Sequence, residues 1–321
     1  MTRTPVIPLE AVASDAVELI AAFRDTGGTS FGSAAVAEAR DSYLASCRRN
    51  GVPNEAVDHV EDLVCPVVGG TITVRRYAAL PPSGDAAIVF LHGGGWALGD
   101  LETHDPICRY LATATGLPVF AVDYRRAPEH RFPIPLDDCA AALRFVAEHA
   151  AGLGAESRRL VIVGDSAGGN LAAVLANDPA MAVEGTAFLG QVLLYPVTDL
   201  SSESASYARI AEGFPLVAES MRWFADLYLA DDSDPADPRL SPLRLDRPVA
   251  PPPPAFIVSL GLDPLGDEGI AYASHLARHG GHVEHHHLPR HAHGIFTSAG
   301  RIPTGRRMLD RAVAFIQEVA S

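Results

Sequence analysis

Apolar residues recur along the chain with two different spacings, which predict alternating strands and helices over most of its length. Short continuous apolar runs are typical of strands buried on both faces, and they predict strands at Ala87–Leu91, Leu117–Val122, Leu160–Val163, Gly190–Tyr195, Ala255–Leu260 and His282–Leu288. Helical spacing lies between them near 104–115, 136–150, 167–177, 265–279 and 304–319. This alternation predicts an α/β fold, with a mostly parallel sheet and helices on both of its faces.

Three regions depart from this alternation. Residues 9–50 carry two helix-like segments, the first with one apolar face made of Val12, Val17, Leu19, Ile20 and Phe23. Around 60–78, β-branched alternation predicts a hairpin that turns at Gly69-Gly70. Residues 200–247 show no strand pattern, but hold a helical stretch near 217–230 and the acidic, proline-rich run ADDSDPADPRLSP. We expect the last segment to be an insertion over the carboxyl edge of the sheet, where ligand sites of α/β proteins form.

Composition narrows the class of protein. Of the 321 residues, 48% are hydrophobic and 20% are charged, which excludes a disordered or fibrous chain. The formal net charge of −14 argues against nucleic acid and anionic membrane surfaces as partners. No apolar run reaches transmembrane length, and Glu10, Asp15 and Glu18 interrupt the only candidate signal region. We therefore expect a cytoplasmic protein without membrane insertion.

The absence of lysine and the spacing of the cysteines exclude some kinds of catalytic and structural site. All 25 basic residues are arginine, so no lysine can act as a catalytic or Schiff-base residue. The four cysteines are far apart and lack regular spacing, which predicts buried free thiols rather than disulfides or a zinc site. They are Cys47, Cys65, Cys108 and Cys139.

The stretch VGDSAGGN, residues 163–170, places Ser166 between a predicted strand and a predicted helix. Glycine at 164 and 168 would avoid collisions with neighbouring backbone at so tight a turn, and the turn would expose the serine hydroxyl. The G-x-S-x-G motif alone also fits a phosphate-binding or merely tight glycine turn. A nucleophilic serine needs a base and an acid elsewhere in the chain.

Candidates for both follow later strands in the order serine, acid, histidine. Asp263 comes three residues after the strand Ala255–Leu260, and His291 and His293 follow the last strand. We predict His293 as the base because Gly294 lets the loop turn its imidazole towards Ser166. Asp267 and Glu268 are rival acids, but acidic residues there are typical of the start of a helix.

A glycine-rich loop provides candidates for stabilising an oxyanion. FLHGGGWALG, residues 90–99, follows a strand, and its glycines allow backbone amides to approach a ligand closely. It lacks the lysine and spacing of a phosphate loop. We predict the amides of Gly94, Gly95 and Ala167 as donors. Trp96 is a candidate for the substrate pocket, with a core position as the alternative.

Eight of the 13 histidines lie between His275 and His293. A metal site built from His285, His287, His291 and His293 is one reading of this segment. Successive strand residues point to opposite faces, however, so only His285 and His287 share a side. We therefore expect no native metal.

Five motifs taken together resemble those of the hormone-sensitive-lipase-type carboxylesterases, a branch of the α/β-hydrolases: HGGGW, DYRRAPEHRFP, GDSAGGN, DPLGDEG and HGIF. The resemblance runs from about residue 60 to the C-terminus. It implies an eight-stranded sheet, no cofactor and hydrolysis of esters with short to medium acyl chains. Ser166 resembles the family's nucleophile, Asp263 its acid and His293 its base. Ile295 departs from the pattern, in which glycine and phenylalanine commonly follow the histidine.

The resemblance also implies a division of the chain. Residues 1–50 and the inserted segment 200–247 would form a helical cap, and residues 51–199 and 248–321 the catalytic domain. Tyr124, Arg125 and Glu129 are expected to brace the glycine loop. A homodimer through the edge of the final strand is expected, as in many relatives. Lactone or amide hydrolysis on the same triad, and a non-catalytic receptor for a small ligand, remain alternative functions.

Overall fold

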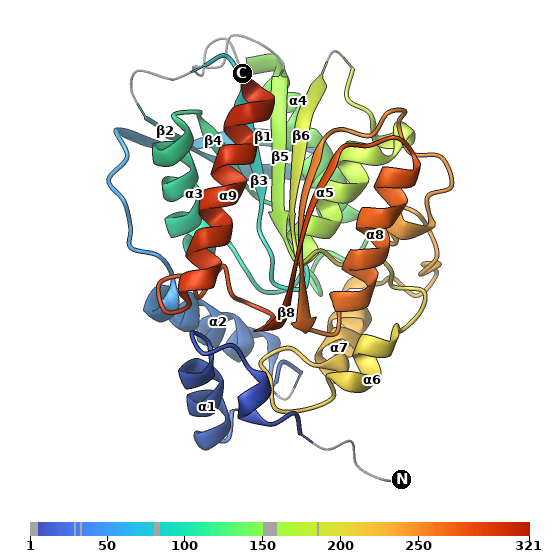
Figure 1. The fold of residues 1–321 in the computed structure, drawn as a ribbon. Helices are drawn as coiled ribbons and strands as arrows, with labels where there is room; N and C mark the ends of the chain where they lie inside the picture. The colour runs from blue at the N-terminus through green and yellow to red at the C-terminus, as the bar shows by residue number, and fades with distance from the viewer. Residues whose placement is uncertain (1–5, 29, 33, 80–83, 150–158, 185) are drawn as a thin grey trace.

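One sheet of eight strands forms the centre of the molecule, in the order β1-β2-β4-β3-β5-β6-β7-β8 (Figure 1). The computed structural model describes residues 6–28, 30–32, 34–79, 84–149, 159–184 and 186–321. Among these residues, β2 pairs antiparallel with β1 and β4, and the other neighbouring strands are parallel. The strands are β1 (His59–Val67), β2 (Gly70–Ala78), β3 (Ala87–Leu91), β4 (Val119–Asp123), β5 (Arg159–Asp165), β6 (Ala187–Leu194), β7 (Ala255–Leu262) and β8 (Val283–Ala292).

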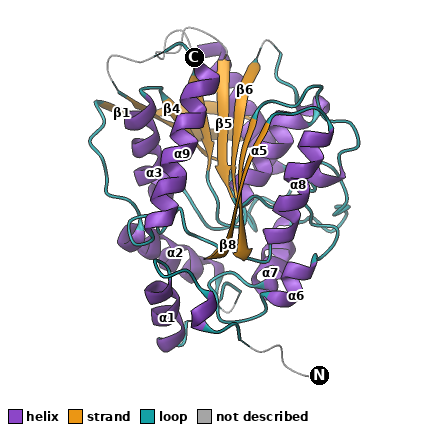
Figure 2. Cartoon of the chain, in the orientation of Figure 1, coloured by secondary structure: helices purple, strands orange, loops and turns teal. Residues whose placement is uncertain are grey.

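Helices cover both faces of the sheet (Figure 2). The α-helices are α1 (Val17–Asp25), α2 (Val36–Asn50), α3 (Leu101–Thr115), α4 (Ile134–His149), α5 (Ala167–Asn177), α6 (Ala205–Arg209), α7 (Ala218–Tyr228), α8 (Gly266–Arg278) and α9 (Pro303–Ala320). Helices α3 and α9 pack on one face, and α4, α5 and α8 pack on the other. None of the described helices is both long and apolar enough to cross a lipid bilayer.

The continuous apolar runs belong to the central strands, which are covered from both sides. Every residue of β3 is buried, and β5 and β7 are buried over nearly their whole length. Their side chains divide into two apolar cores, one on each face of the sheet. The predicted α/β class, the mostly parallel sheet and the helices on both faces are confirmed.

Several predicted boundaries were wrong. Strand β6 begins at Ala187, three residues before the predicted Gly190, and β4 begins at Val119, two residues after the predicted Leu117. The hairpin turns at Val68-Gly69, and Gly70 already belongs to β2 because it pairs with Val67. The final strand runs on to Ala292 because its ladder with β7 resumes beyond an irregularity near Leu262. Residue 150, the predicted end of the helix 136–150, lies outside the described residues.

Helices α1, α2, α6 and α7 gather at the carboxyl end of the sheet, near the arrowhead of β8 (Figure 1). The N-terminal segment is tied there by polar contacts. The backbone amide of Ala13 donates to the carbonyl of Arg290 at 2.8 Å, and a carboxylate oxygen of Asp15 accepts from the Thr304 amide at 2.9 Å. These contacts fasten a segment from the beginning of the chain against the end of β8 and the start of α9.

Candidate active site

Ser166 occupies a strained turn between β5 and α5. Its φ is +55°, in the region that non-glycine residues rarely adopt, and this turn positions its side chain above the sheet edge. A Cβ atom at Gly164 would lie 2.2 Å from the Gly168 carbonyl oxygen, and one at Gly168 would lie 2.0 Å from that of Leu91. The predicted reason for both glycines, collision with backbone, is confirmed.

A chain of hydrogen bonds joins Ser166, His293 and Asp263. The Oγ atom of Ser166 lies 3.0 Å from Nε2 of His293, and Nδ1 of His293 lies 2.6 Å from Oδ2 of Asp263. The other carboxylate oxygen of Asp263 accepts from the Leu265 amide at 2.9 Å, which fixes the carboxylate in place. Gly294 has a φ of +91°, as the expected turn after His293 requires. The structure therefore brings together three residues that lie 97 and 30 positions apart in sequence.

The rival residues have other partners. His291 contacts Asp15 at 3.0 Å, away from Ser166. Asp267 binds Arg209 at 3.1 Å, and Glu268 is buried with one carboxylate oxygen accepting from the Thr198 amide at 2.7 Å. Both acids lie in the first turn of α8, as predicted for the start of a helix.

The glycine loop after β3 is held against the turn at Ser166 by Asp165. Oδ1 of Asp165 accepts a hydrogen bond from the Gly93 amide at 2.8 Å. Nε2 of His104 lies 3.1 Å from the same oxygen, although the ring orientation does not complete a hydrogen bond. Burial by itself would raise the pKa of Asp165, but His104 and the Gly93 amide outweigh it and hold the pKa below its ordinary value.

The amides proposed for an oxyanion site are grouped around the serine. Gly94 and Gly95 have φ values of +116° and +59° and line the same cavity as Ser166. Ala167 begins α5, where backbone amides have no acceptor within the helix. Among the described residues, no group accepts a hydrogen bond from these three amides.

A cavity of about 610 Å³ lies at the carboxyl end of the sheet, and its lining includes Ser166 and His293 as well as Asp165. Its outer walls come from α1 and α2 and from the segment between β6 and β7, which contributes Leu216 and Phe224. A volume of this size is typical of sites for small molecules.

A family model described as the alpha/beta hydrolase fold matches residues 88–297. The chain belongs to the α/β-hydrolase family. It is 38% identical over 287 residues to an ethyl acetate hydrolase of Pseudomonas putida, across 88% of this chain and 89% of the relative. It is 42% identical over 268 residues to the carboxylic ester hydrolase LipN of Mycobacterium tuberculosis, across 81% and 70% of the two chains.

A solved structure of an α/β-hydrolase enzyme from the metagenome of Lake Arreo, Spain, matches this α/β-hydrolase with a TM-score of 0.89. The two chains are 34% identical, over 96% of this chain and 98% of the other. A thermostable carboxylesterase cloned from a metagenomic library matches with a TM-score of 0.83 at 35% identity, over 90% of this chain and 98% of the other. The resemblance to the hormone-sensitive-lipase-type carboxylesterases is thereby confirmed.

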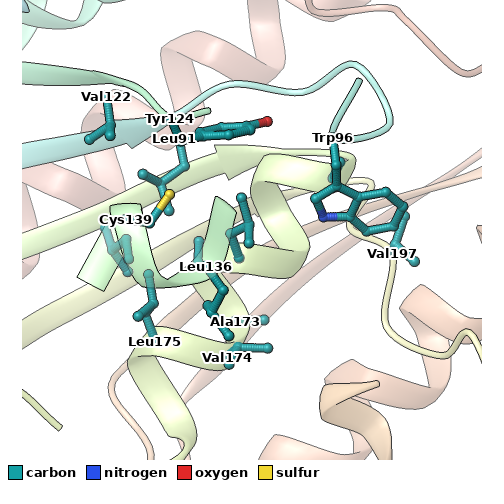
Figure 3. Packing of buried hydrophobic residues seen from close by; sticks show 14 of the residues in the cluster. Leu91, Trp96, Val122, Tyr124, Leu136, Cys139, Ala173, Val174, Leu175 and Val197 are labelled. Carbon is teal, nitrogen blue, oxygen red and sulfur yellow. The ribbon is translucent and has the colours of Figure 1, made fainter. Parts of the chain in front are cut away.

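Trp96 requires a correction, because it does not line the cavity. Its side chain is 0% exposed and stacks on Tyr228 with 4.4 Å between ring centroids. Figure 3 shows it beside Val197 within the apolar core that also holds Leu136. Its backbone has a φ of +56°, at the end of the three glycines. The sequence could not distinguish these positions, since both suit an aromatic residue.

The loop containing DYRRAPE supports the glycine loop in part as expected. The Tyr124 hydroxyl donates to the His92 carbonyl at 2.8 Å. Arg125 instead binds Asp138 at 2.7 Å. Glu129 supports the glycine loop indirectly. Its carboxylate lies 2.7 Å from the guanidinium of Arg40, and Nε of Arg40 donates to the carbonyl of Ala97 at 2.8 Å.

The histidines of the final strand do not converge. His285 and His287 share a face, as strand alternation predicts, and each has a ring nitrogen within 2.9 Å of the Ser259 hydroxyl. Together with the separate partners of His291 and His293, this leaves the described residues without a group of three or more His, Cys, Asp or Glu side chains that could hold a metal ion. The four cysteines are free and buried, as predicted.

Two residues of the site were missed in the sequence. Tyr195 has a φ of +41° and places its ring 4.1 Å from the His293 ring, between centroids. Asp165 joins the glycine loop to the turn at Ser166. Tyr195 follows β6 at the carboxyl edge, and this position is the only signal that could have identified it.

Proposed function

We propose that this α/β-hydrolase is a serine carboxylesterase that hydrolyses short- to medium-chain acyl esters through an acyl-enzyme intermediate. The observation that carries the proposal is the hydrogen-bonded chain of Ser166, His293 and Asp263 at the wall of a cavity large enough for a small ester. The names of its relatives, an ethyl acetate hydrolase and a carboxylic ester hydrolase, support the same reaction.

In the proposed reaction, Nε2 of His293 takes the proton of Ser166 as Oγ attacks the ester carbonyl carbon. Asp263 orients the imidazole and stabilises its positive charge. The amides of Gly94, Gly95 and Ala167 donate to the oxyanion that forms on the carbonyl oxygen. His293 then gives its proton to the departing alcohol, and water attacks the acyl-enzyme in the reverse sequence of proton transfers. These groups and water complete the reaction, so the proposal needs no cofactor.

We also propose that residues 1–50 and 200–247 form a cap over a catalytic domain made of residues 51–199 and 248–321. The cavity supports this division. Its inner wall is made by Ser166, His293 and the glycine loop, whereas its outer wall is made by α1, α2 and the segment around Phe224.

The test of the proposed function is the hydrolysis of p-nitrophenyl acetate and butyrate by single variants. We expect Ser166→Ala and His293→Ala each to lower kcat by about 10⁴-fold or more, since the triad acts as a unit. His291→Ala is the matched control, because its imidazole contacts Asp15 instead of Ser166. Retention of a tenth of the activity by Ser166→Ala, or inactivity of His291→Ala alone, would contradict the assignment.

The edge position of β8 supports a proposed homodimer. An edge strand leaves one row of backbone groups without a strand partner, and pairing between two copies would satisfy them. Light scattering at micromolar concentration tests this, and a monomeric mass would contradict it. The buried free thiols support a proposed cytoplasmic location, because reduced cysteines are typical of that compartment.

A further inference from the structure

Two arginines line the active-site cavity without a carboxylate partner. Arg49, near the end of α2, and Arg301, just before α9, both contribute to its wall. Neither forms an ion pair with any described residue, whereas the adjacent Arg48 lies 3.9 Å from Glu102 and outside the cavity. In a protein of net charge −14, exposed arginines without an ion-pair partner in the wall of a binding cavity form a local site of positive potential.

The two positions lie on neighbouring segments of the backbone, one of which follows His293. The Gly300 amide donates to the Asn50 carbonyl at 3.0 Å, so the backbone next to Arg301 touches the backbone next to Arg49. The segment that carries Arg301 begins immediately after His293, and its turns are closed by hydrogen bonds such as Ser298 amide to Gly294 carbonyl at 3.1 Å. The arginine pair therefore belongs to the wall on the His293 side of the cavity.

The other charged groups of the wall do not neutralise this pair. Asp165 is buried and already accepts the Gly93 amide. Glu18, on α1, lines the cavity but forms no ion pair with either arginine. The exposed wall thus carries two positive side chains and one negative one.

The lining of the cavity includes both polar and apolar side chains. Ser46, Asn50 and Ser298 accompany the arginines, whereas Phe31, Leu216 and Phe224 form an apolar wall. Phe224 lies next to the glycine loop, because a Cβ atom at Gly95 would be 2.1 Å from its ring. The proposed mechanism relates these two walls to the two halves of an ester. His293 must give its proton to the alcohol oxygen, so the alcohol half of a bound ester lies towards His293 and the segment after it that carries Arg301.

We propose that the enzyme selects esters whose alcohol half carries a carboxylate, which Arg49 and Arg301 bind. A guanidinium donates two parallel hydrogen bonds to a carboxylate, and two arginines can share one such group. The apolar wall at Phe31 and Phe224 then receives the acyl chain. This inference rests on the proposed esterase function and adds the substrate class.

Two acetate esters that differ in one charge test the inference: 4-acetoxybenzoate, which is anionic, and its neutral amide, 4-acetoxybenzamide. The measured quantity is the ratio of their kcat/KM values, because intrinsic differences in reactivity cancel when variants are compared with the wild type. We expect Arg49→Gln and Arg301→Gln each to lower the ratio about three- to fivefold, and the double variant about tenfold, as for partly exposed ion pairs. Added salt should lower the wild-type ratio towards that of the double variant.

Arg48→Gln is the matched control, since it removes a charge one residue away from Arg49 and outside the cavity. It should leave the ratio unchanged. A second measurement avoids turnover: 4-hydroxybenzoate should bind Ser166→Ala in calorimetry, and more weakly once both arginines are replaced.

The two proposals fail in different ways. If the wild type hydrolyses neither acetate nor simple p-nitrophenyl esters, the esterase function is wrong. If it hydrolyses them but the double variant keeps the wild-type ratio, or Arg48→Gln lowers the ratio as much, the anion-binding role of Arg49 and Arg301 is wrong.

Discussion

Individual residues carry strain where the site is built. Among the described residues, Trp96, Ser166 and Tyr195 are the non-glycine residues with positive φ, and the last two line the cavity. Positive φ at such residues persists only where the surrounding structure imposes it. At Ser166 the helix and strand on either side impose it. At Tyr195 the backbone amide is held by the Val258 carbonyl at 2.8 Å, which keeps the ring against His293.

Glu268 provides a prediction at the residue scale. Its side chain is 3% exposed, and burial raises its pKa well above 4.5 even though the Thr198 and Asp199 amides act in the opposite direction. At a pH between the unfolded pKa and the raised folded pKa, the folded protein therefore keeps the Glu268 carboxyl protonated, whereas the unfolded chain releases this proton. Stability from this group is present below the unfolded pKa and is lost as pH rises towards the folded pKa.

We expect Glu268→Gln to gain stability relative to the wild type as pH rises from about 5 to about 8. Glutamine keeps an oxygen that can accept from the Thr198 amide, but it carries no titratable proton. Thermal unfolding followed across this range measures the difference in Tm. Asp267→Asn, on the exposed side of the same helix turn, is the control. A difference in Tm that stays constant with pH for Glu268→Gln would show that Glu268 does not carry the proton.

At the scale of single elements, β8 combines two roles. Its end delivers His293 to the site, and its body packs His285 and His287 against Ser259 of β7. Burial lowers the pKa of both histidines. At His285 the neighbouring His287 and His286 rings lower the pKa further. At His287 the Asp267 carboxylate raises the pKa and Arg209 lowers it. Protonation therefore opposes the packing of the edge strand at His285, which is half-buried, and does so less at His287, which is exposed. These two histidines contribute stability above the ordinary pKa of 6.5, which is lost as pH falls through the lowered folded pKa.

We expect the wild type to lose stability between about pH 7 and about pH 5, and the double variant His285→Gln/His287→Gln to lose less over the same interval. Glutamine retains a donor and an acceptor near Ser259 and has no charge to bury. Urea unfolding at the two pH values gives the two losses in the free energy of unfolding. Equal losses in both proteins would assign the acid sensitivity to other groups.

At the scale of the whole molecule, the cavity is closed by segments that are far apart in sequence. Helices α1 and α2 come from the first 50 residues and Phe224 from the middle of the chain, yet all of them line the space above Ser166. Their positions set how much of an acyl chain can be buried.

We expect p-nitrophenyl esters with acyl chains of about two to eight carbons to be the best substrates, because each methylene gains about 0.8 kcal/mol only while apolar wall remains to bury it. Beyond the outer wall a longer chain gains nothing. Assays across the series, below and above the solubility limit of each ester, measure this. A maximum at roughly sixteen carbons, or a rate increase when droplets form, would indicate an interfacial lipase and contradict the prediction.

The sequence by itself determined the sheet, its central strands and the three residues of the hydrogen-bonded chain. Central strands of a parallel sheet are buried on both faces, so they appear as continuous apolar runs whatever packs on them. Ser166, Asp263 and His293 follow such strands, and the carboxyl ends of parallel strands meet at one edge. The demands at Gly164 and Gly294 are set by residues a few positions away, whereas the space at Gly168 is limited by the Leu91 carbonyl, 77 positions earlier in the chain.

Only the tertiary structure decided which side chains share the cavity. Trp96 lies in the core, whereas Tyr195 lies against the ring of His293. No local spacing in the sequence distinguishes these two positions for an aromatic residue. The contact between Asp165 and Gly93 and the adjacency of Arg49 and Arg301 join residues 72 and 252 positions apart. Such contacts depend on how separate elements pack, and hydrophobic periodicity specifies only the face that each element buries.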